Sequence, residues 1–286
     1  MPRFRLTLAY DGTDFAGSQV QPNQRTVQGE LERALVQLLG QPTSTTFAGR
    51  TDRGVHATGQ VVAFDASSWQ WEACALQRAL NATLPDDLRT TGASACDDAF
   101  HPRFDAAWRE YRYWIAPGVV SPFLGRCAWM PRSGVELDLM SAGALHLVGT
   151  HDFASFAGGG EGVPWSERAK RARGTTRTIV RCACRETAVM SGPGAGLEQV
   201  VEIAVVADGF LPRMVRNIVG ALVEVGQGRQ SPDWAGEILR HRDRRLGSVL
   251  APAHGLTLSA VGYGDEPIND WNPATPERRG SREGAV

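Results

Sequence analysis

The sequence has almost no lysine and no long apolar run. Its single lysine is Lys170, so nearly all of the positive charge is carried by arginine. No apolar segment approaches the roughly 18 residues that a helix needs to cross a bilayer. The first residues, MPRFRLTLAYDG, have the pattern of a strand rather than of a signal peptide. These absences argue against a helical membrane protein and predict a soluble, cytoplasmic one.

Metal-ligand motifs are absent as well. The six histidines include no H-x-x-x-H pair, and the cysteines include no C-x-x-C pair. Two cysteines, Cys182 and Cys184, lie two apart in a strand-like segment and therefore share one face, which Val180 extends as an apolar face. The pattern predicts buried thiols in a reducing compartment, with no metal site and no disulfide. The full set of cysteines is Cys74, Cys96, Cys127, Cys182 and Cys184.

Several hydrolase and nucleotide-binding motifs are also absent. The chain contains no G-x-S-x-G, S-x-x-K or H-E-x-x-H, which argues against serine, penicillin-type and zinc hydrolases. The segment SGPGAG (Ser191–Gly196) lacks the Gly-Lys-Ser/Thr ending of a phosphate-binding P-loop. Because it separates two strand-like segments, it is better explained as a hairpin connection.

The charge that is present is unevenly distributed. The net charge is −1 and 21% of the residues are charged. Between residues 168 and 185 no acid interrupts seven cations, and a second basic group, RHRDRR, spans residues 240–245. Guanidinium groups match phosphate oxygens bidentately, so local basic stripes on a near-neutral chain predict a polyanion bound at a defined place. The alternative is an ordinary solvated surface. The seven cations are Arg168, Lys170, Arg171, Arg173, Arg177, Arg181 and Arg185.

The apolar periodicity predicts an α+β fold. In the first half, strands at 4–10, near 45, at 58–65 and at 88–95 alternate with helices at 26–38 and 73–84 in the order β-α-β-β-α-β, and Thr26 is the predicted N-cap of the first helix. This split-βαβ (ferredoxin-like) order usually gives an antiparallel sheet with helices on one face. The second half follows a looser version of the plan, with strands at 108–116, 175–189, 197–208 and 255–261 and helices at 137–148, 212–226 and 234–241.

One carboxylate has unusual neighbours. In AGRTDRGVHATGQVVAFD (Ala48–Asp65), Asp52 stands between Arg50 and Arg53. An aspartate in such a loop can be a turn residue whose carboxylate accepts backbone N–H bonds. Flanking guanidinium groups also favour its ionised form, which suits a nucleophile and not a proton donor. A carboxylate that has no second acid, histidine or metal beside it is suited to few reactions. One of them is attack at the anomeric carbon of a sugar.

Two strands combine arginine with other informative residues. In WREYRYWI (Trp108–Ile115), Arg109, Tyr111 and Tyr113 share one face, where tyrosine either packs in the core or stacks on a base. In the strand at 175–189, regular alternation predicts one exposed, phosphate-contacting or merely solvated face. This second face would carry Arg177, Ile179, Arg181, Ala183 and Arg185.

The segment FLPRMVRNIVGALVEVG (Phe210–Gly226) predicts an amphipathic helix that opens with Pro212 in its first turn. Arg213 and Arg216, three apart, would share one face of this helix. An arginine near a helix N-terminus works against the helix dipole. The placement therefore predicts an anionic partner for Arg216.

The chain resembles the TruA family of tRNA pseudouridine synthases. AGRTDRGVHATGQVVAFD is similar to the family signature G-R-T-D-x-G-V-H-A-x-G-Q, and other family segments follow in the family's order. These segments are LAYDGTDFAG, RTVQGELERAL, REYRYWI, HDFASFA, TTRTI, GFLPRMVRNIVGALVEVG and AP-x-H-G-L. The resemblance implies two α/β domains of RRM-like type, at 1–105 and 106–264, whose antiparallel sheets meet around a central active-site cleft. The remaining residues, 265–286, are expected to form a disordered tail.

The resemblance also implies an activity, which is isomerisation of uridine to pseudouridine at positions 38, 39 and 40 of the tRNA anticodon stem-loop. Asp52 would be the nucleophile, Tyr111 would stack on the target base and help remove the C5 proton, and Arg216 would pair with Asp52. Arg50 would help to extrude the target nucleotide. Further RNA contacts are expected from Arg53, Arg177, Arg181 and Arg213. The implied enzyme is a homodimer that binds tRNA and uses neither a metal nor another cofactor.

The sequence departs from the family pattern at two places. Ser18 stands where the family has tryptophan in G-W-Q, and Pro212 and Arg213 stand where tyrosine or histidine is frequent. Two other functions remain open on the residues alone. One is a non-catalytic RNA-binding protein in which Asp52 is only a turn residue, and the other is a nucleoside hydrolase that uses the same carboxylate to release free base.

Overall fold

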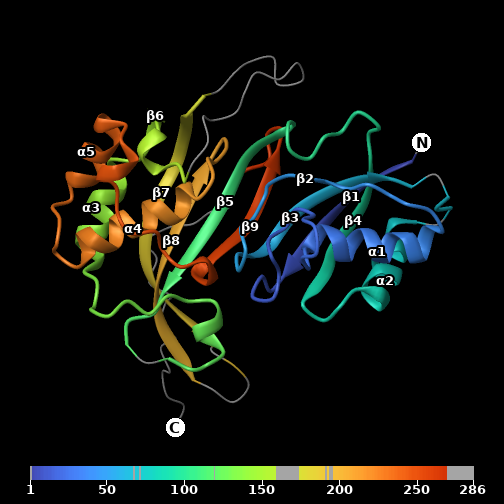
Figure 1. Cartoon of the computed structure of the whole chain (residues 1–286), viewed down its shortest axis with the longest axis horizontal. Coiled ribbons are helices and arrows are strands. Elements are labelled where there is room, and N and C mark those ends of the chain that lie inside the picture. Colours follow the sequence, from blue (N-terminus) through green and yellow to red (C-terminus); the bar gives the residue numbers. More distant parts are fainter. Residues whose placement is uncertain are drawn as a thin grey trace, which may run out of the picture.

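The computed structural model describes residues 2–66, 68–70, 72–118, 120–158, 174–190, 192 and 196–268 (Figure 1). Three predicted features fall largely outside these residues. They are the basic segment at 168–173, the inner part of SGPGAG and the tail beyond residue 268.

Nine strands and five α-helices make up the described fold. The elements are β1 (Arg3–Tyr10), α1 (Val27–Leu39), β2 (Thr46–Phe47), β3 (His56–Asp65), α2 (Ala73–Thr83), β4 (Leu88–Cys96), β5 (Ala106–Ile115), α3 (Leu137–Leu145), β6 (Gly149–Asp152), β7 (Thr176–Met190), β8 (Leu197–Ala207), α4 (Met214–Gly226), α5 (Trp234–His241) and β9 (Leu256–Tyr263). All helices and all strands except β6 correspond to predicted elements, most of them within two residues at each end.

All strands belong to one sheet, with the order β4-β1-β3-β9-β5-β8-β7-β6 and with β2 paired to β3. The pairing is antiparallel throughout except between β3 and β9, which run parallel. The mixed, mostly antiparallel character agrees with an α+β fold. The two expected sheets are joined edge to edge, because the last strand enters between the strands of the two halves.

The helices form two groups (Figure 1). The helices α1 and α2 lie on the half of the sheet that contains β1 and β4, whereas α3, α4 and α5 lie on the half with β7 and β8. The strands β5 and β9 run between the groups. One continuous apolar core extends under both halves, from Phe4 to Val261.

The helix α1 shows why these residues fold locally as they do. The predicted N-cap is confirmed, because Thr26 Oγ1 accepts a hydrogen bond from the N–H of Gly29 at 3.2 Å. Gly40 ends the helix in the left-handed conformation, with φ of 71°. The apolar face is buried and consists of Val27, Leu31, Ala34, Leu35 and Leu39.

The parallel junction between β3 and β9 brings two backbones unusually close together. The paired residues are His56 with Thr257 and Ala57 with Leu258. A Cβ built on Gly59 would lie 2.1 Å from the carbonyl oxygen of Ser259. The junction therefore requires glycine at this position, because any side chain would push the strands apart.

Candidate active site

Asp52 lies in the loop between β2 and β3, where the two halves of the sheet meet. The loop turns through a hydrogen bond from the N–H of Val55 to the carbonyl oxygen of Asp52 at 3.1 Å, and Gly54 has φ of 78°. The Asp52 side chain is 44% exposed. Within the described residues its carboxylate contacts Arg216 and accepts no backbone N–H. The turn-residue alternative therefore accounts for its backbone but not for its carboxylate.

Arg216 reaches this loop from the first turn of α4. Its Nη1 lies 3.4 Å from Asp52 Oδ2, and its Nε donates to the carbonyl oxygen of Ala251 at 2.7 Å. The N–H of Ala251 in turn donates to the carbonyl oxygen of Arg216 at 3.2 Å. The guanidinium group is thus held by the segment before β9 and directed at a carboxylate 164 residues earlier in the chain.

Tyr111 lies on β5 and packs into the core, as one of the two interpretations of its strand predicted. Its ring meets that of Phe210 edge to face, with centroids 5.1 Å apart, and only 8% of the residue is exposed. Burial is the main cause that raises the pKa of the Tyr111 hydroxyl, and the negative charge of Asp52 adds to it. Tyr111 therefore lies in the electrostatic field of Asp52 and keeps its proton at neutral pH.

The segment before Asp52 is held by hydrogen bonds to a buried side-chain amide. Gln60 on β3 is completely buried, and its Nε2 donates to the carbonyl oxygen of Gly49 at 2.7 Å. Its Oε1 accepts the N–H of the same glycine at 3.3 Å. In the sequence, Gln60 is recognisable only as part of the family signature around Asp52. A glutamine within the apolar run QVVAF is the signal that indicates such a buried, fully bonded role.

The arginines that flank Asp52 are exposed. Arg53 Nη2 donates to Gln24 Oε1 at 3.1 Å. Arg50 lies close enough to Arg103 that, after burial, its positive charge is the second cause that lowers the pKa of Arg103. Arg103 was missed by the sequence analysis, because it lies 53 residues from Arg50 in a loop without a recognisable motif. Two neighbouring guanidinium groups repel each other unless an anion lies between them.

The predicted exposed face of β7 is wrong at its first two residues, Arg177 and Ile179, which are both buried. The pairing of β7 with β8 shifts between Ile179 and Arg181, so an extra residue, Val180, interrupts the alternation. Arg177 is 2% exposed, and its guanidinium group donates to the carbonyl oxygens of Gly174 and Thr176. Val180, expected on the apolar face, is instead 49% exposed.

The residues of β7 that follow Val180 keep their predicted faces. Cys182 and Cys184 are buried, and burial raises the pKa of both thiols. Arg181 and Arg185 lie on the opposite face and are half-buried. Arg185 forms an ion pair with Glu202 at 2.6 Å. Arg181, one of the predicted RNA contacts, thus keeps its predicted face.

The predicted start of the arginine-bearing helix also differs from the structure. The helix α4 begins at Met214, so Pro212 lies before it and Arg213 is its N-cap in the left-handed conformation, with φ of 58°. Arg213 is exposed and does not share a helix face with Arg216. The side chain of Arg213 packs against Gly158 instead. A Cβ built on Gly158 would lie 2.6 Å from the Cβ of Arg213.

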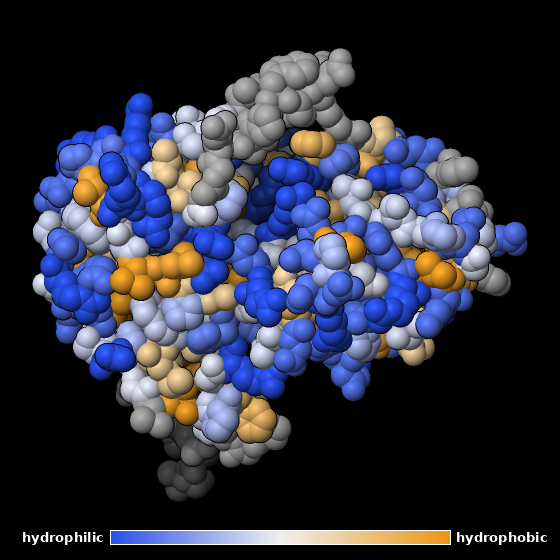
Figure 2. Space-filling view, viewed as in Figure 1, coloured by the Kyte–Doolittle hydropathy of each residue, from blue (hydrophilic) through white to orange (hydrophobic). Residues whose placement is uncertain are grey.

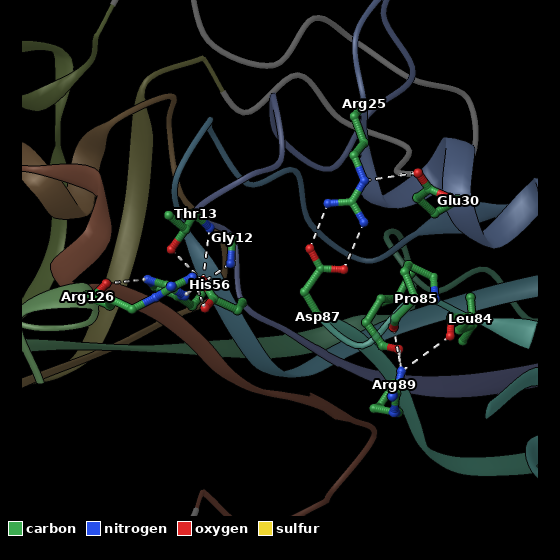
Figure 3. A network of polar contacts seen from close by, with 12 residues as sticks. Gly12, Thr13, Arg25, Glu30, His56, Leu84, Pro85, Asp87, Arg89 and Arg126 are labelled. Carbon is green, nitrogen blue, oxygen red and sulfur yellow. Dashed lines mark hydrogen bonds and ion pairs between the residues drawn. The ribbon is translucent and has the colours of Figure 1, made fainter. Parts of the chain in front are cut away.

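His56, the first residue of β3, contacts both halves of the chain (Figure 3). The N–H of Gly12 donates to its Nδ1 at 3.0 Å, and its Nε2 lies 3.2 Å from the carbonyl oxygen of Arg126. Burial lowers the pKa of His56, although the carboxylate of Asp11 acts in the opposite direction. The imidazole is therefore neutral in the folded protein, with the proton on Nε2.

This neutral histidine predicts that stability depends on pH. The folded-state pKa lies below the ordinary value of 6.5, so the unfolded chain binds the proton more readily. Stability should be constant above about pH 6.5 and should fall as the pH decreases from there toward the depressed pKa. Urea unfolding measured across this range would check the effect. His56→Gln should show a weaker dependence, whereas His241→Gln, an exposed control, should keep it; equal slopes for all three proteins would contradict the assignment.

A cavity of about 710 Å³ lies on the other side of the sheet. Its β5 residues, Glu110, Arg112 and Trp114, alternate with Tyr111 and Tyr113 along the strand and therefore face away from them. None of the predicted site residues lines it. The candidate site is instead on the face that carries the helices, and Figure 2 shows that hydrophilic residues prevail over the middle of the molecule, between the two helix groups.

The described residues also lack two kinds of feature. They contain no group of three or more His, Cys, Asp or Glu side chains that could hold a metal ion. None of their helices is long and apolar enough to span a membrane. All five cysteines are free thiols.

Comparison with known proteins identifies close relatives. A family model described as tRNA pseudouridine synthase matches residues 7–105 and 144–264. The chain is 40% identical over 292 residues to tRNA pseudouridine synthase A of Nitratidesulfovibrio vulgaris, covering 92% of this chain and all of that protein. The protein of the same name from Thermosipho africanus is 40% identical over 91% of this chain and 99% of its own length. The Brevibacillus brevis protein is 41% identical over 92% of this chain and its own full length.

Proposed function

Since the chain belongs to the tRNA pseudouridine synthase family, we propose that it isomerises uridine to pseudouridine at positions 38, 39 and 40 of the tRNA anticodon stem-loop, with Asp52 as the nucleophile. The choice of the catalytic residues rests on one structural observation. Asp52, Tyr111 and Arg216 come from three distant segments and meet around one loop. Arg216 lies 3.4 Å from Asp52, and the Tyr111 hydroxyl lies 3.8 Å from where a Cβ on Gly49 would be.

The reaction breaks the bond between uracil N1 and ribose C1′, turns the base and forms a bond between C5 and C1′, with release of the C5 proton. Asp52 suits the first step, because its carboxylate is 44% exposed and lies 3.4 Å from the guanidinium group of Arg216. Arg216 also aims the carboxylate, since its own Nε is fixed to Ala251. The isomerisation is balanced without an oxidant, a reductant or a nucleotide cofactor.

Tyr111 is proposed to support the uracil ring and to help remove the C5 proton. Its ring is held at a fixed angle by the edge-to-face contact with Phe210, which favours stacking against one orientation of a flipped base. Because burial keeps the hydroxyl protonated, Tyr111 would act as a relay and not as a phenolate, with its oxygen accepting the C5 proton while its own proton passes to water. The C5 proton is acidic once C5 is bonded to C1′, so a weak acceptor suffices.

The exposed arginines around the loop are proposed to bind the RNA backbone. Arg50, with Arg103 beside it, would hold a phosphate between two guanidinium groups and help to keep the target nucleotide out of its stack. Arg53, Arg181 and Arg213 are proposed as further contacts. Arg177 is left out because its guanidinium group is buried against backbone carbonyls.

The proposal extends to the assembly. Two domains, at 1–105 and 106–264, would flank a central cleft, and a cytoplasmic homodimer would bind tRNA across both subunits. The net charge of −1 supports a dimer, because basic surfaces of two subunits that face one groove can attract RNA where a single near-neutral chain attracts it weakly.

The function is tested by incubating the protein with an unmodified anticodon stem-loop that has uridine at all three positions. We expect pseudouridine at one or more of them, and none in a control stem-loop with cytidine there. Release of free uracil would indicate a nucleoside hydrolase instead. Binding without any product, under conditions in which a known relative is active, would indicate a non-catalytic RNA-binding protein and would overturn the proposal.

A further inference from the structure

We infer that Ser18 is a positioning residue for Asp52, an inference that rests on the proposed function. Arg216 aims the Asp52 carboxylate, but this contact alone does not fix where the carboxylate lies. The Asp52 side chain is 44% exposed, and the distance of 3.4 Å to Arg216 is long for a charge-assisted hydrogen bond. The backbone that carries Asp52 must therefore contribute to the position of the carboxylate.

Ser18 holds that backbone at the residue before Asp52. Its Oγ accepts the N–H of Thr51 at 2.9 Å, and its own N–H donates to the carbonyl oxygen of Thr51 at 3.0 Å. Ser18 is 1% exposed and Thr51 is 7% exposed, so water cannot replace either bond. Both backbone groups of Thr51 are thus bound by one residue, which fixes the peptide plane that leads into Asp52.

Ser18 is itself tied to rigid structure. Its carbonyl oxygen accepts the N–H of Gln28 in the first turn of α1 at 2.9 Å, and the carbonyl oxygen of Gly17 accepts the N–H of Val27 at 3.3 Å. A Cβ on Gly17 would lie 2.9 Å from the carbonyl oxygen of Thr51, so the two segments are in direct backbone contact. The loop is therefore fixed to a helix and not to another loop, which gives a site the precision that catalysis requires.

The side chain of Thr51 is bound separately. Its Oγ1 and the hydroxyl of Tyr10 are 2.8 Å apart. Burial raises the pKa of Tyr10 to about 12, so this contact does not titrate near neutral pH. Neither serine nor threonine titrates there either. The whole arrangement around Thr51 is therefore insensitive to pH, and its loss should change the rate without changing the shape of the pH profile.

The consequence for the reaction follows from the geometry. Ser18→Ala leaves the Thr51 N–H buried without an acceptor, and the loop must shift to satisfy it. A displacement of about 1 Å at a reacting group can cost about 10²-fold in rate. The exposed arginines that are proposed to bind RNA do not contact Ser18. We therefore expect kcat to fall about 10- to 100-fold, with little change in KM.

The experiment compares Ser18→Ala with Ser155→Ala in single- and multiple-turnover assays of pseudouridine formation. Ser155 is also completely buried, and its Oγ donates to the carbonyl oxygen of Ile238 at 2.7 Å, far from the loop. We expect a reduced kcat and an unchanged pH profile for Ser18→Ala only. A wild-type kcat for folded Ser18→Ala, or equal losses in both variants, would overturn the inference. An inactive wild-type protein would instead refute the proposed function.

Two further measurements keep the inference testable if Ser18→Ala folds poorly. Hydrogen exchange of the Thr51 amide should be faster in Ser18→Ala than in the wild type, whatever the activity, because the acceptor of that N–H is removed. Tyr10→Phe, which removes the second contact of Thr51, should lower kcat in the same direction. Unchanged exchange at Thr51 together with a wild-type kcat for Tyr10→Phe would show that these contacts do not position Asp52.

Discussion

Replacing Asp52 by asparagine is expected to lower the rate of pseudouridine formation by at least about 10³-fold. Asparagine has nearly the same shape and can still contact Arg216, but it has no charged oxygen to attack the ribose. The side chain is 44% exposed, so the substitution should leave the fold intact. Binding of tRNA should be retained, because the change removes a negative charge near RNA phosphates and leaves the arginines in place.

The matched control for this experiment is Asp138→Asn, which removes the same charge from an exposed position in the first turn of α3. Its rate should equal that of the wild type. Product formation can be followed by release of tritium from C5 of labelled uridine, and binding by filter retention of the RNA. If Asp52→Asn retained the wild-type rate, another residue would have to be the nucleophile, and the roles proposed for Arg216 and Tyr111 would lose their basis.

Replacing Gly59 by alanine is expected to destabilise the protein by about 3 kcal/mol or more. The new Cβ would lie 2.1 Å from the carbonyl oxygen and 2.8 Å from the carbonyl carbon of Ser259, both of them backbone atoms that cannot rotate away. Relief therefore requires β3 and β9 to separate, and these strands provide the only direct pairing between the two halves of the sheet in the described structure.

The control is Gly134→Ala, because no atom lies within 4 Å of the Cβ built there and its φ is not positive. It should change stability by less than about 0.5 kcal/mol. Urea unfolding gives both values. Because Asp52 and Arg216 come from opposite halves, Gly59→Ala should also lower activity. A Gly59→Ala protein that unfolds at the same urea concentration as the control would show that the junction can relax without cost.

Local structure could be predicted from the sequence where local physical chemistry determines it. The periodicity of α1 and its Thr26 cap were correct because both depend on residues within one helical turn. The face of Arg177 was wrong because a single inserted residue, Val180, reverses the alternation, and nothing in the composition of β7 marks that insertion. The pairing of β9 with both halves could not be predicted, since strand order depends on contacts made after the elements form.

The same distinction applies to the candidate site. The unfavourable position of Arg216 at a helix N-terminus predicted an anionic partner, and the family resemblance implied that this partner is Asp52. The structure brings the two side chains together. Ser18 was recognised only as a departure from the family pattern. Its contacts with Thr51 join segments 33 residues apart, and a serine gives no sign in the sequence of the partner it will bind. Roles that depend on such long-range hydrogen bonds require coordinates.

The central position of β9 has a consequence for how the protein is made. A ribosome releases the chain from its N-terminus, so β1 to β4 with α1 and α2 can assemble while the rest is still being synthesised. Residues 256–263 are synthesised only after the other strands of both halves, yet they form the strand that joins the two halves. The sheet that holds Asp52 and Arg216 on one frame is therefore complete only after β9 has left the exit tunnel.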